Sequence, residues 1–274
     1  MGTTADNRPI GVFDSGVGGL TVLSELRRRL PAESTVYLGD NGRAPYGPRP
    51  AAEVVRYTLE CVRWLLSQDV KMLLLACNTA TAQALPQVRE QAPVPVLGVV
   101  RPGAVAAAAS TRAGHVGVIA TVGTVASGAY PSAILEAEPR IVVTQLACPT
   151  LVPLVEAGEL EGTIAEAEVR GYLAELFGAD GAIDTLLLGC THYPLLRPLI
   201  ERQAGPRVAV VDSAFTTALA VEDLLDALGS RSRGPGSGMH RVATTGDTAA
   251  FAAVADRIFG ASLPVVEQAV LAAD

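Results

Sequence analysis

Short hydrophobic runs alternate with longer amphipathic stretches along almost the whole chain. Continuous apolar runs occupy residues 10–14, 35–40 and 71–77. After each of them comes a stretch in which apolar residues recur every three or four positions, at 15–30, 51–68 and 78–92. Strands without polar alternation are typical of parallel sheets that helices cover on both faces. The pattern therefore predicts an α/β fold with buried parallel strands.

The alternation restarts near residue 98, after a further apolar run at 94–100. Three more strands are expected at 114–121, 141–148 and 184–190, and helices at 122–135, 150–160, 163–178 and 192–203. The motif "GVFDSGVGG" at Gly11 resembles "GVIATVGTV" at Gly117, and "LLLACNT" around Cys77 resembles "LLLGCTH" around Cys190. The spacing is similar in the two cases, which predicts an internal duplication.

The last part of the chain is expected to rejoin the first half. It reads as a strand at 207–212, a helix at 216–229, a flexible loop at 230–238 and a final strand and helix at 240–247 and 248–260. We therefore expect two lobes. Residues 1–97 and 208–274 would form lobe A, and residues 98–207 would form lobe B.

Composition excludes several classes of protein. The 274 residues carry a formal net charge of -7, which argues against a non-specific nucleic-acid binder. No apolar run reaches the length of a membrane span, and no secretory signal is evident. The four cysteines are few and widely spaced, as in proteins of a reducing compartment. We expect a cytoplasmic protein with neither a membrane nor a nucleic acid as its partner.

The chain contains a single lysine, Lys71, which precedes the apolar run at 72–75. Schiff-base chemistry, including pyridoxal phosphate catalysis, would have to use this residue. Ligands gather at the opposite, carboxyl ends of parallel strands. The position of Lys71 therefore argues against a pyridoxal enzyme.

Cys77 and Cys190 each end an apolar run of three leucines and one small residue. In a β/α unit this position is the carboxyl end of a strand, where unpaired amides of the following helix lower the pKa of a thiol. A lone cysteine is more often a buried core residue, and we interpret Cys61 and Cys148 in this way. Two cysteines in matching positions of two repeats favour a pair of thiols across one cleft.

Two opposed thiols suit racemisation at a carbon atom. One thiolate would remove a proton from one face while the other thiol returns a proton to the opposite face. A disulfide pair and a metal site are the alternatives. The pattern Cys190-Thr191-His192 is weak as a metal site because no second compact cluster supplies further ligands.

Other polar residues follow the same predicted strand ends. Asp14 and Ser15 begin a glycine turn that lacks the spacing of a nucleotide-binding motif, and a simple capped turn is the alternative. The remaining candidates are Asp40, Tyr46 and Gly47 in one polar loop, and Thr121 and Thr124 in the second half.

His192 lies in a polar turn and is the best histidine for acid-base assistance. His115 and His240 are interpreted as surface residues. Glu156 ends an apolar segment, and from the sequence alone it reads as a carboxylate that faces solvent.

The motifs together resemble the glutamate racemases of the aspartate/glutamate racemase superfamily. The resemblance runs from "GVFDSGVGGLTV" through "PYG", "ACNTATA", "GVIATVGTV" and "LVPLVEAG" to "LLLGCTHYPLL". It implies two doubly wound α/β lobes related by pseudo-twofold symmetry, with the active site in the cleft between them. It also implies interconversion of L- and D-glutamate without a cofactor or metal, supplying D-glutamate for peptidoglycan, and the expected assembly is a homodimer.

The resemblance also implies roles for individual residues. Cys77 and Cys190 would be the two bases, Asp14 would assist Cys77, and His192 would assist Cys190 with Glu156 in support. The residues expected to contact substrate are Asp14, Ser15, Tyr46, Gly47, Asn78, Thr79, Thr121, Thr124, Thr191 and His192.

Three other functions remain open at this point. An aspartate or hydantoin racemase of the same superfamily would keep both cysteines. A bilobed binding protein would need no paired cysteines and usually carries a signal peptide. A thiol-redox protein would place its cysteines close together, as in C-x-x-C, and no such motif is present.

Overall fold

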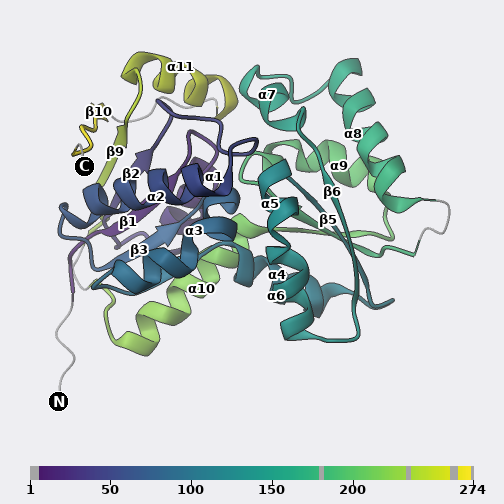
Figure 1. Cartoon of the computed structure of the whole chain (residues 1–274), viewed down its shortest axis with the longest axis horizontal. Helices are drawn as coiled ribbons and strands as arrows, with labels where there is room; N and C mark the ends of the chain where they lie inside the picture. The colour runs from purple at the N-terminus through teal and green to yellow at the C-terminus, as the bar shows by residue number, and fades with distance from the viewer. Residues whose placement is uncertain (1–5, 179–181, 233–235, 260–264, 273–274) are drawn as a thin grey trace.

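Two parallel β-sheets form the centre of the protein, and Figure 1 shows them side by side. The structure is a computed structural model that describes residues 6–178, 182–232, 236–259 and 265–272. The first sheet has six strands in the order β10-β9-β2-β1-β3-β4, and the second has four in the order β6-β5-β7-β8. All of the strand pairs are parallel. The predicted α/β fold with parallel sheets is confirmed.

The strands of the first sheet are β1 (Ile10–Asp14), β2 (Thr35–Gly39), β3 (Met72–Leu75), β4 (Val96–Gly98), β9 (His240–Thr244) and β10 (Val266–Gln268). Those of the second are β5 (His115–Ala120), β6 (Val142–Ala147), β7 (Thr185–Gly189) and β8 (Ala209–Asp212). We call each sheet with the helices that cover it the first and the second lobe.

The two sheets repeat one strand order. Four strands of the first sheet run β2-β1-β3-β4, and the second sheet runs β6-β5-β7-β8. Cys77 therefore follows β3 and Cys190 follows β7, the corresponding strand of the second lobe. In the first sheet, β2 is added on one side of β1 and β3 on the other, and β5, β6 and β7 repeat this pattern in the second sheet. Ligands of open α/β sheets bind at the carboxyl ends of the strands where the order of addition changes sides in this way. This arrangement is what an internal duplication would produce.

The second sheet extends beyond the expected limit of lobe B. Strand β8 pairs with β7, from Thr185 opposite Ala209 to Leu188 opposite Asp212. Residues 209–212 thus lie in the second sheet, whereas we expected them in lobe A. The sequence offered no sign of this because an apolar strand completes either sheet equally well. Strands β9 and β10 do lie in the first sheet, and the lobe limits as a whole stay a prediction.

Helices cover both sheets, and the longer ones follow the predicted amphipathic stretches (Figure 1). They are α1 (Leu20–Arg29), α2 (Ala51–Leu66), α3 (Asn78–Gln91), α4 (Val100–Ser110), α5 (Val122–Ser127), α6 (Ala129–Ala137), α7 (Leu151–Glu156), α8 (Thr163–Phe177), α9 (Arg197–Ala204), α10 (Ser213–Leu228) and α11 (Thr248–Phe259), with a short 3₁₀ helix η1 (Tyr193–Leu196). Helix α10 leaves the second sheet and packs on α1 of the first lobe, so it joins the two lobes.

Some elements differ from the predicted ones. Helix α4 and strand β10 were not expected, and the expected helix at 122–135 is divided into α5 and α6. Gly128 makes this division, because its φ of 66° is a left-handed conformation that ends a helix. Within the expected loop at 230–238, residues 233–235 lie outside the described residues, as does Gly260 at the expected end of the last helix.

The strands are buried because each lies between layers of helices. Every residue of β1, β2, β3 and β7 is buried. Lys71 is also buried. Its Nζ lies 2.6 Å from Glu33 Oε2 and donates hydrogen bonds to the carbonyl oxygens of Asp6 and Ser230, both at 2.8 Å. These partners satisfy a charge that would otherwise be costly to bury. Among the described residues no helix is both long and apolar enough to cross a membrane.

Candidate active site

A cavity of about 550 Å³ lies where the carboxyl ends of the two sheets face each other. This volume lies within the range of small-molecule binding sites. Its lining includes Ser15, Tyr46, Gly47, Cys77, Asn78 and Thr79 from the first lobe and Thr121, Glu156, Cys190, Thr191 and His192 from the second. The predicted residues Asp14 and Thr124 lie directly behind this lining, each with 1% of its surface exposed. The structure thus brings together the site residues that we expected.

Cys77 occupies the N-cap of α3. Its sulfur accepts a hydrogen bond from the backbone amide of Ala80 at 3.4 Å, and it donates to the hydroxyl of Ser15 at 3.5 Å. Only 5% of its surface is exposed. The apolar strand β3 ends just before the helix begins, and this break places the thiol at the cavity wall.

Burial controls the acidity of this thiol. It raises the pKa of Cys77 to about 12, and the negative charge of Asp14 acts in the same direction. The hydrogen bonds of the sulfur with Ser15 and Ala80 lower the pKa, as the helix N-terminus was expected to do, but their effect is smaller. The expected lowering is therefore wrong for Cys77, because removal from water disfavours the thiolate more strongly than the helix amides favour it.

Cys190 has a different partner. Its sulfur lies 3.8 Å from Nδ1 of His192, and Nε2 of the same ring lies 3.0 Å from Oε1 of Glu156. Burial alone would lower the pKa of His192, but the hydrogen bonds with Cys190 and Glu156 raise it to about 10. The ring is thus held as an imidazolium between a sulfur and a carboxylate. Glu156 contacts this ring and does not simply face solvent, as the sequence alone suggested.

Helix α7 holds Glu156, and a residue of the first lobe contacts the end of this helix. Arg257 of α11 donates from its guanidinium to the Glu156 carbonyl oxygen at 3.0 Å. A positively charged group at the carboxyl end of a helix stabilises that end. This contact joins the C-terminal part of the chain to the residue that orients His192.

Asp14 follows β1 and connects the two halves of the site. Its carboxylate accepts a hydrogen bond from the amide of Gly16 at 2.9 Å and from the Thr191 hydroxyl at 3.5 Å. Burial raises the pKa of Asp14, while the nearby His192 lowers it. Asp14 acts electrostatically on Cys77, and its hydroxyl partner is in the second lobe.

The glycine turn after β1 allows this close approach. A Cβ atom at Gly18 would lie 2.4 Å from Nδ1 of His192 and 2.4 Å from Oγ1 of Thr191. Side chains other than hydrogen therefore do not fit without displacing the two residues that follow Cys190. The sequence "SGVGG" is explained by contact with the opposite lobe rather than by phosphate binding.

Three threonines connect the lobes at the other side of the cavity. The Thr79 hydroxyl lies 2.8 Å from the Thr121 hydroxyl and 3.3 Å from that of Thr124, and the last two are 2.9 Å apart. Close by, the amide of Gly123 donates to the carbonyl oxygen of Gly47 at 2.8 Å. The cavity is thus closed on two sides by contacts between the lobes.

Residues 10–224 match the Asp/Glu/Hydantoin racemase family. A glutamate racemase of Streptococcus equi subsp. equi is 49% identical over 251 residues, which is 91% of this chain and 94% of the relative. This chain belongs to the Asp/Glu/hydantoin racemase family.

Solved structures place the chain among the glutamate racemases of this family. The glutamate racemase isoform RacE1 of Bacillus anthracis superposes with a TM-score of 0.92 at 42% identity, covering 97% of this chain and 98% of the other. A glutamate racemase of Francisella tularensis, solved in complex with D-glutamate, has a TM-score of 0.89 at 33% identity, with the same coverage of both chains.

The racemase cavity also has an apolar side that the sequence did not reveal. It is formed by Val17, Val152, Pro153, Phe251 and Val254, from α7, α11 and the glycine turn. These residues are apolar and belong to no recognisable sequence motif, and the two residues of α11 are distant in sequence from the other site residues. Only the return of the C-terminal segment to the first lobe brings them to the site.

The remaining cysteines and histidines of this racemase have other partners. Cys61 and Cys148 are both fully buried, as we expected of core thiols, and Cys148 also contributes to the cavity lining. His115 and His240 are partly buried, not surface residues, and each contacts a threonine of a neighbouring strand at 2.9 Å. In the described part of the chain, no group of three or more His, Cys, Asp or Glu side chains could hold a metal ion.

Proposed function

We propose that this racemase interconverts L- and D-glutamate without a cofactor, with Cys77 and Cys190 as bases on opposite faces of the α-carbon. The observation that carries the proposal is the placement of the two thiols. They follow corresponding strands of the two lobes, and both line one cavity. The Francisella relative, whose structure contains D-glutamate, has the same fold.

The reaction needs one proton removed and one returned. The thiolate of one cysteine takes the α-proton, and the resulting carbanion receives a proton from the thiol of the other cysteine on the opposite face. The first sulfur is then a thiol and the second a thiolate, so the enzyme is ready for the reverse reaction. No group other than these two needs to change its protonation state.

Substrate charge would help to form the thiolate. Burial disfavours the charged form of Cys77, and the ammonium group of glutamate would bring an opposite charge into the cavity. One amide oxygen, Oδ1 of Asn78, is buried without a hydrogen-bond partner among the described residues. It can accept a hydrogen bond from that ammonium group. The side chains of Ser15, Thr79 and Thr191 line the same cavity, and we propose that they contact the carboxylates.

The helpers of the two cysteines differ. His192, held by Glu156, would lie as a cation beside the Cys190 thiolate that forms during turnover. At Cys77, the charge of Asp14 acts on the thiol and Ser15 forms a hydrogen bond with it. We propose Asp14, His192 and Glu156 as the residues that assist the two bases.

Replacing either thiol tests the mechanism. Cys77→Ala and Cys190→Ala should each lower racemisation by about a thousandfold or more, because the loss of an acid-base group has effects of this order. Circular dichroism should show an unchanged fold, and Cys61→Ser, which alters a buried thiol outside the cavity, should keep its kcat.

Deuterium exchange at Cα in heavy water gives the second measurement. In each cysteine variant, we expect exchange of one enantiomer only, because one base remains on one face. Full racemase activity in either variant would contradict the two-base mechanism. No exchange of glutamate by the wild type, together with turnover of aspartate or a hydantoin, would instead assign a different substrate of the family.

Cellular role and assembly form part of the same proposal. D-glutamate produced in this way would supply peptidoglycan synthesis in the cytoplasm, and the four free cysteines fit a reducing compartment. We also propose that the protein forms a homodimer.

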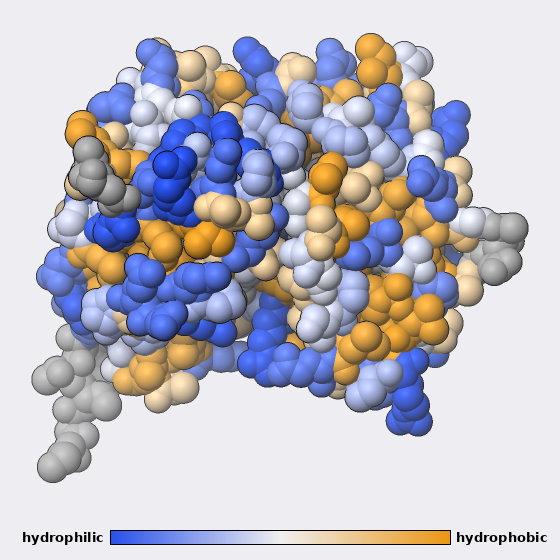
Figure 2. Space-filling model, viewed as in Figure 1, coloured by the Kyte–Doolittle hydropathy of each residue, from blue (hydrophilic) through white to orange (hydrophobic). Residues whose placement is uncertain are grey.

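Figure 2 shows hydrophobic residues gathered on the visible face of the second lobe, and such patches often mark interfaces. Sedimentation velocity distinguishes a dimer from a monomer.

A further inference from the structure

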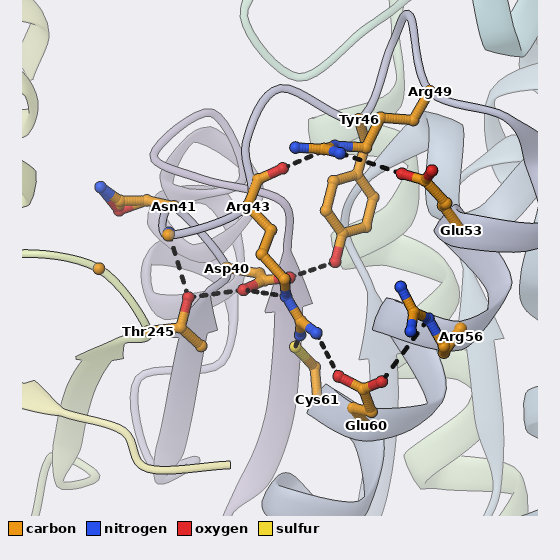
Figure 3. A network of polar contacts seen from close by, with 12 residues as sticks. Asp40, Asn41, Arg43, Tyr46, Arg49, Glu53, Arg56, Glu60, Cys61 and Thr245 are labelled. Carbon is orange, nitrogen blue, oxygen red and sulfur yellow. Dashed lines mark hydrogen bonds and ion pairs between the residues drawn. The ribbon is translucent and has the colours of Figure 1, made fainter. Parts of the chain in front are cut away.

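The loop between β2 and α2 forms one wall of the cavity and rests on a network of charged residues (Figure 3). Ala44, Pro45, Tyr46, Gly47 and Pro48 of this loop line the cavity. The charged residues of the network, which include Asp40, Arg43 and Glu60, do not line the cavity. The network therefore reaches substrate only through the loop.

A fully buried carboxylate, Asp40, is at the centre of the network. It accepts a hydrogen bond from the Tyr46 hydroxyl, from the Thr245 hydroxyl at 2.5 Å and from Nε of Arg43 at 2.8 Å. Its side chain is 0% exposed. A buried carboxylate requires a cation or several donors, and Arg43 is the cation in contact with it.

Arg43 connects this carboxylate to α2. Its guanidinium forms an ion pair with Glu60, lies 3.4 Å from the sulfur of Cys61 and stands 4.2 Å above the ring of Tyr57. Its carbonyl oxygen accepts a hydrogen bond from Nε of Arg49 at 2.8 Å. The side chain of Arg43 thus fixes the loop to α2. The Arg43 carbonyl oxygen is joined to the same helix through Arg49, whose Nη1 lies 3.0 Å from Oε2 of Glu53.

We propose that Arg43, acting through Asp40 and Glu60, is a positioning residue that sets the Tyr46–Gly47 segment against the substrate. The segment is fixed at two points, one within the network and one in the second lobe. The Tyr46 hydroxyl is held by Asp40, and the Gly47 carbonyl oxygen accepts from Gly123 of the second lobe. A shift at Arg43 would therefore alter both the wall that faces glutamate and a contact between the lobes.

The planar guanidinium is needed for this task. It serves Asp40 through Nε and Glu60 through a terminal nitrogen at the same time. A lysine supplies one charge at one point and cannot hold both carboxylates in this geometry. Arg43→Lys should thus keep the positive charge but should not hold the loop in its position.

The inference rests on the proposed glutamate racemisation, and its test is a split between KM and kcat. The loop contributes binding that is the same for bound substrate and transition state, so its displacement raises KM more than it lowers kcat. For Arg43→Lys and Arg43→Met we expect the KM for both enantiomers to rise by about tenfold, with kcat within about threefold of the wild type. Glu60→Gln should raise KM in the same direction but less.

Arg56→Met is the matched control. Arg56 approaches the same Glu60 at 4.0 Å and the same Tyr57 ring at 4.9 Å, but its side chain is 60% exposed and does not contact Asp40. Arg56→Met should therefore leave KM unchanged. If Arg43→Met does not fold, Arg43→Lys and Glu60→Gln decide the question.

Two results would overturn the inference. The first is an unchanged KM in Arg43→Lys and Glu60→Gln, whether or not their melting temperatures fall, because only stability would then depend on the network. The second is an equal rise in KM in Arg56→Met. A wild type that does not racemise glutamate would instead refute the proposed function, and calorimetric titration of the same variants with D-glutamate would still report on the position of the loop.

Discussion

The two cysteines of the site differ in their immediate surroundings, although they follow corresponding strands. Cys77 contacts a hydroxyl and a backbone amide, whereas Cys190 contacts an imidazole that a carboxylate orients. The two thiols therefore rely on different groups. A cationic His192 lies next to Cys190, whereas the thiolate of Cys77 depends on the charge that a ligand brings.

The charge of His192 makes stability depend on pH. The folded pKa of about 10 lies above the ordinary value of 6.5, so the folded protein binds this proton more tightly than the unfolded chain. The stabilisation is fully present below about pH 6.5, falls as the pH rises, and is lost above about pH 10.

Urea unfolding at several pH values measures this effect. Between about pH 7 and 10 the free energy of unfolding of the wild type should fall toward that of His192→Gln. A constant difference between the two proteins over this range would contradict an imidazolium at this position.

At the scale of elements, the turn between β1 and α1 brings the lobes into contact. Replacing Gly18 by alanine would place a methyl group 2.4 Å from His192 Nδ1 and Thr191 Oγ1. Because a displacement of about 1 Å in an active site can lower activity by roughly a hundredfold, we expect a loss of this size in kcat/KM.

Gly171 provides the control for this substitution. It lies within α8, and a Cβ atom there meets no atom within 4 Å. Gly171→Ala should keep full activity and raise stability by about 0.5–1 kcal/mol, since glycine disfavours a helix. Equal losses of activity in both variants would show that the effect at Gly18 is not local.

The elements were predictable where local sequence determines them. Runs such as "MLLL" in β3 and "TLLLG" in β7 are buried on both faces, and their apolar character reveals them directly. The division between α5 and α6 depends on the left-handed Gly128, which sequence spacing does not show. The sheet that receives β8 is decided by pairing with a distant strand, and such choices are not encoded in the strand itself.

The same distinction applies to the site. Polar residues at strand ends, such as Ser15 and Asn78, were found because the chain marks these ends with small and polar residues. The apolar wall from Phe251 and Val254 was missed, because it arises from tertiary packing of α11. The high pKa of Cys77 was missed for a related reason, since it depends on how much water the folded lobes exclude.

At the scale of the whole molecule, the site exists only while the lobes stay in register. Contacts across the cavity include the threonine hydroxyls and the bond from Gly123 to Gly47, and the Thr21 hydroxyl donates to the Thr191 carbonyl oxygen at 3.0 Å. Helix α10 crosses from the second sheet to α1. The distance between the two thiols is therefore set by contacts that belong to neither lobe alone.

Thr79→Val tests the threonine contact. The change removes the hydroxyl that joins the first lobe to Thr121 and Thr124 but keeps the shape of the side chain. A net hydrogen bond contributes about 0.5–1.5 kcal/mol, so we expect a fall in kcat/KM of roughly threefold to tenfold. Steady-state kinetics in both directions measures it.

Thr216→Val serves for comparison, because within the described residues the Thr216 hydroxyl bonds only to the backbone oxygens of Asp212 and Ser213. It should alter the melting temperature slightly and leave kcat/KM unchanged. A wild-type kcat/KM in Thr79→Val would show that the threonine cluster does not hold the lobes for catalysis.

The burial of Lys71 has a practical consequence. This residue is the only lysine of the chain, and its side chain is 1% exposed in its ion pair with Glu33. Reagents that acylate amines would therefore find no accessible lysine side chain on the folded protein. Acylation of Lys71 would occur only when the contacts of its side chain with residues 6, 33, 230 and 232 open. Mass spectrometry of that one site would count opening events, with no label to introduce.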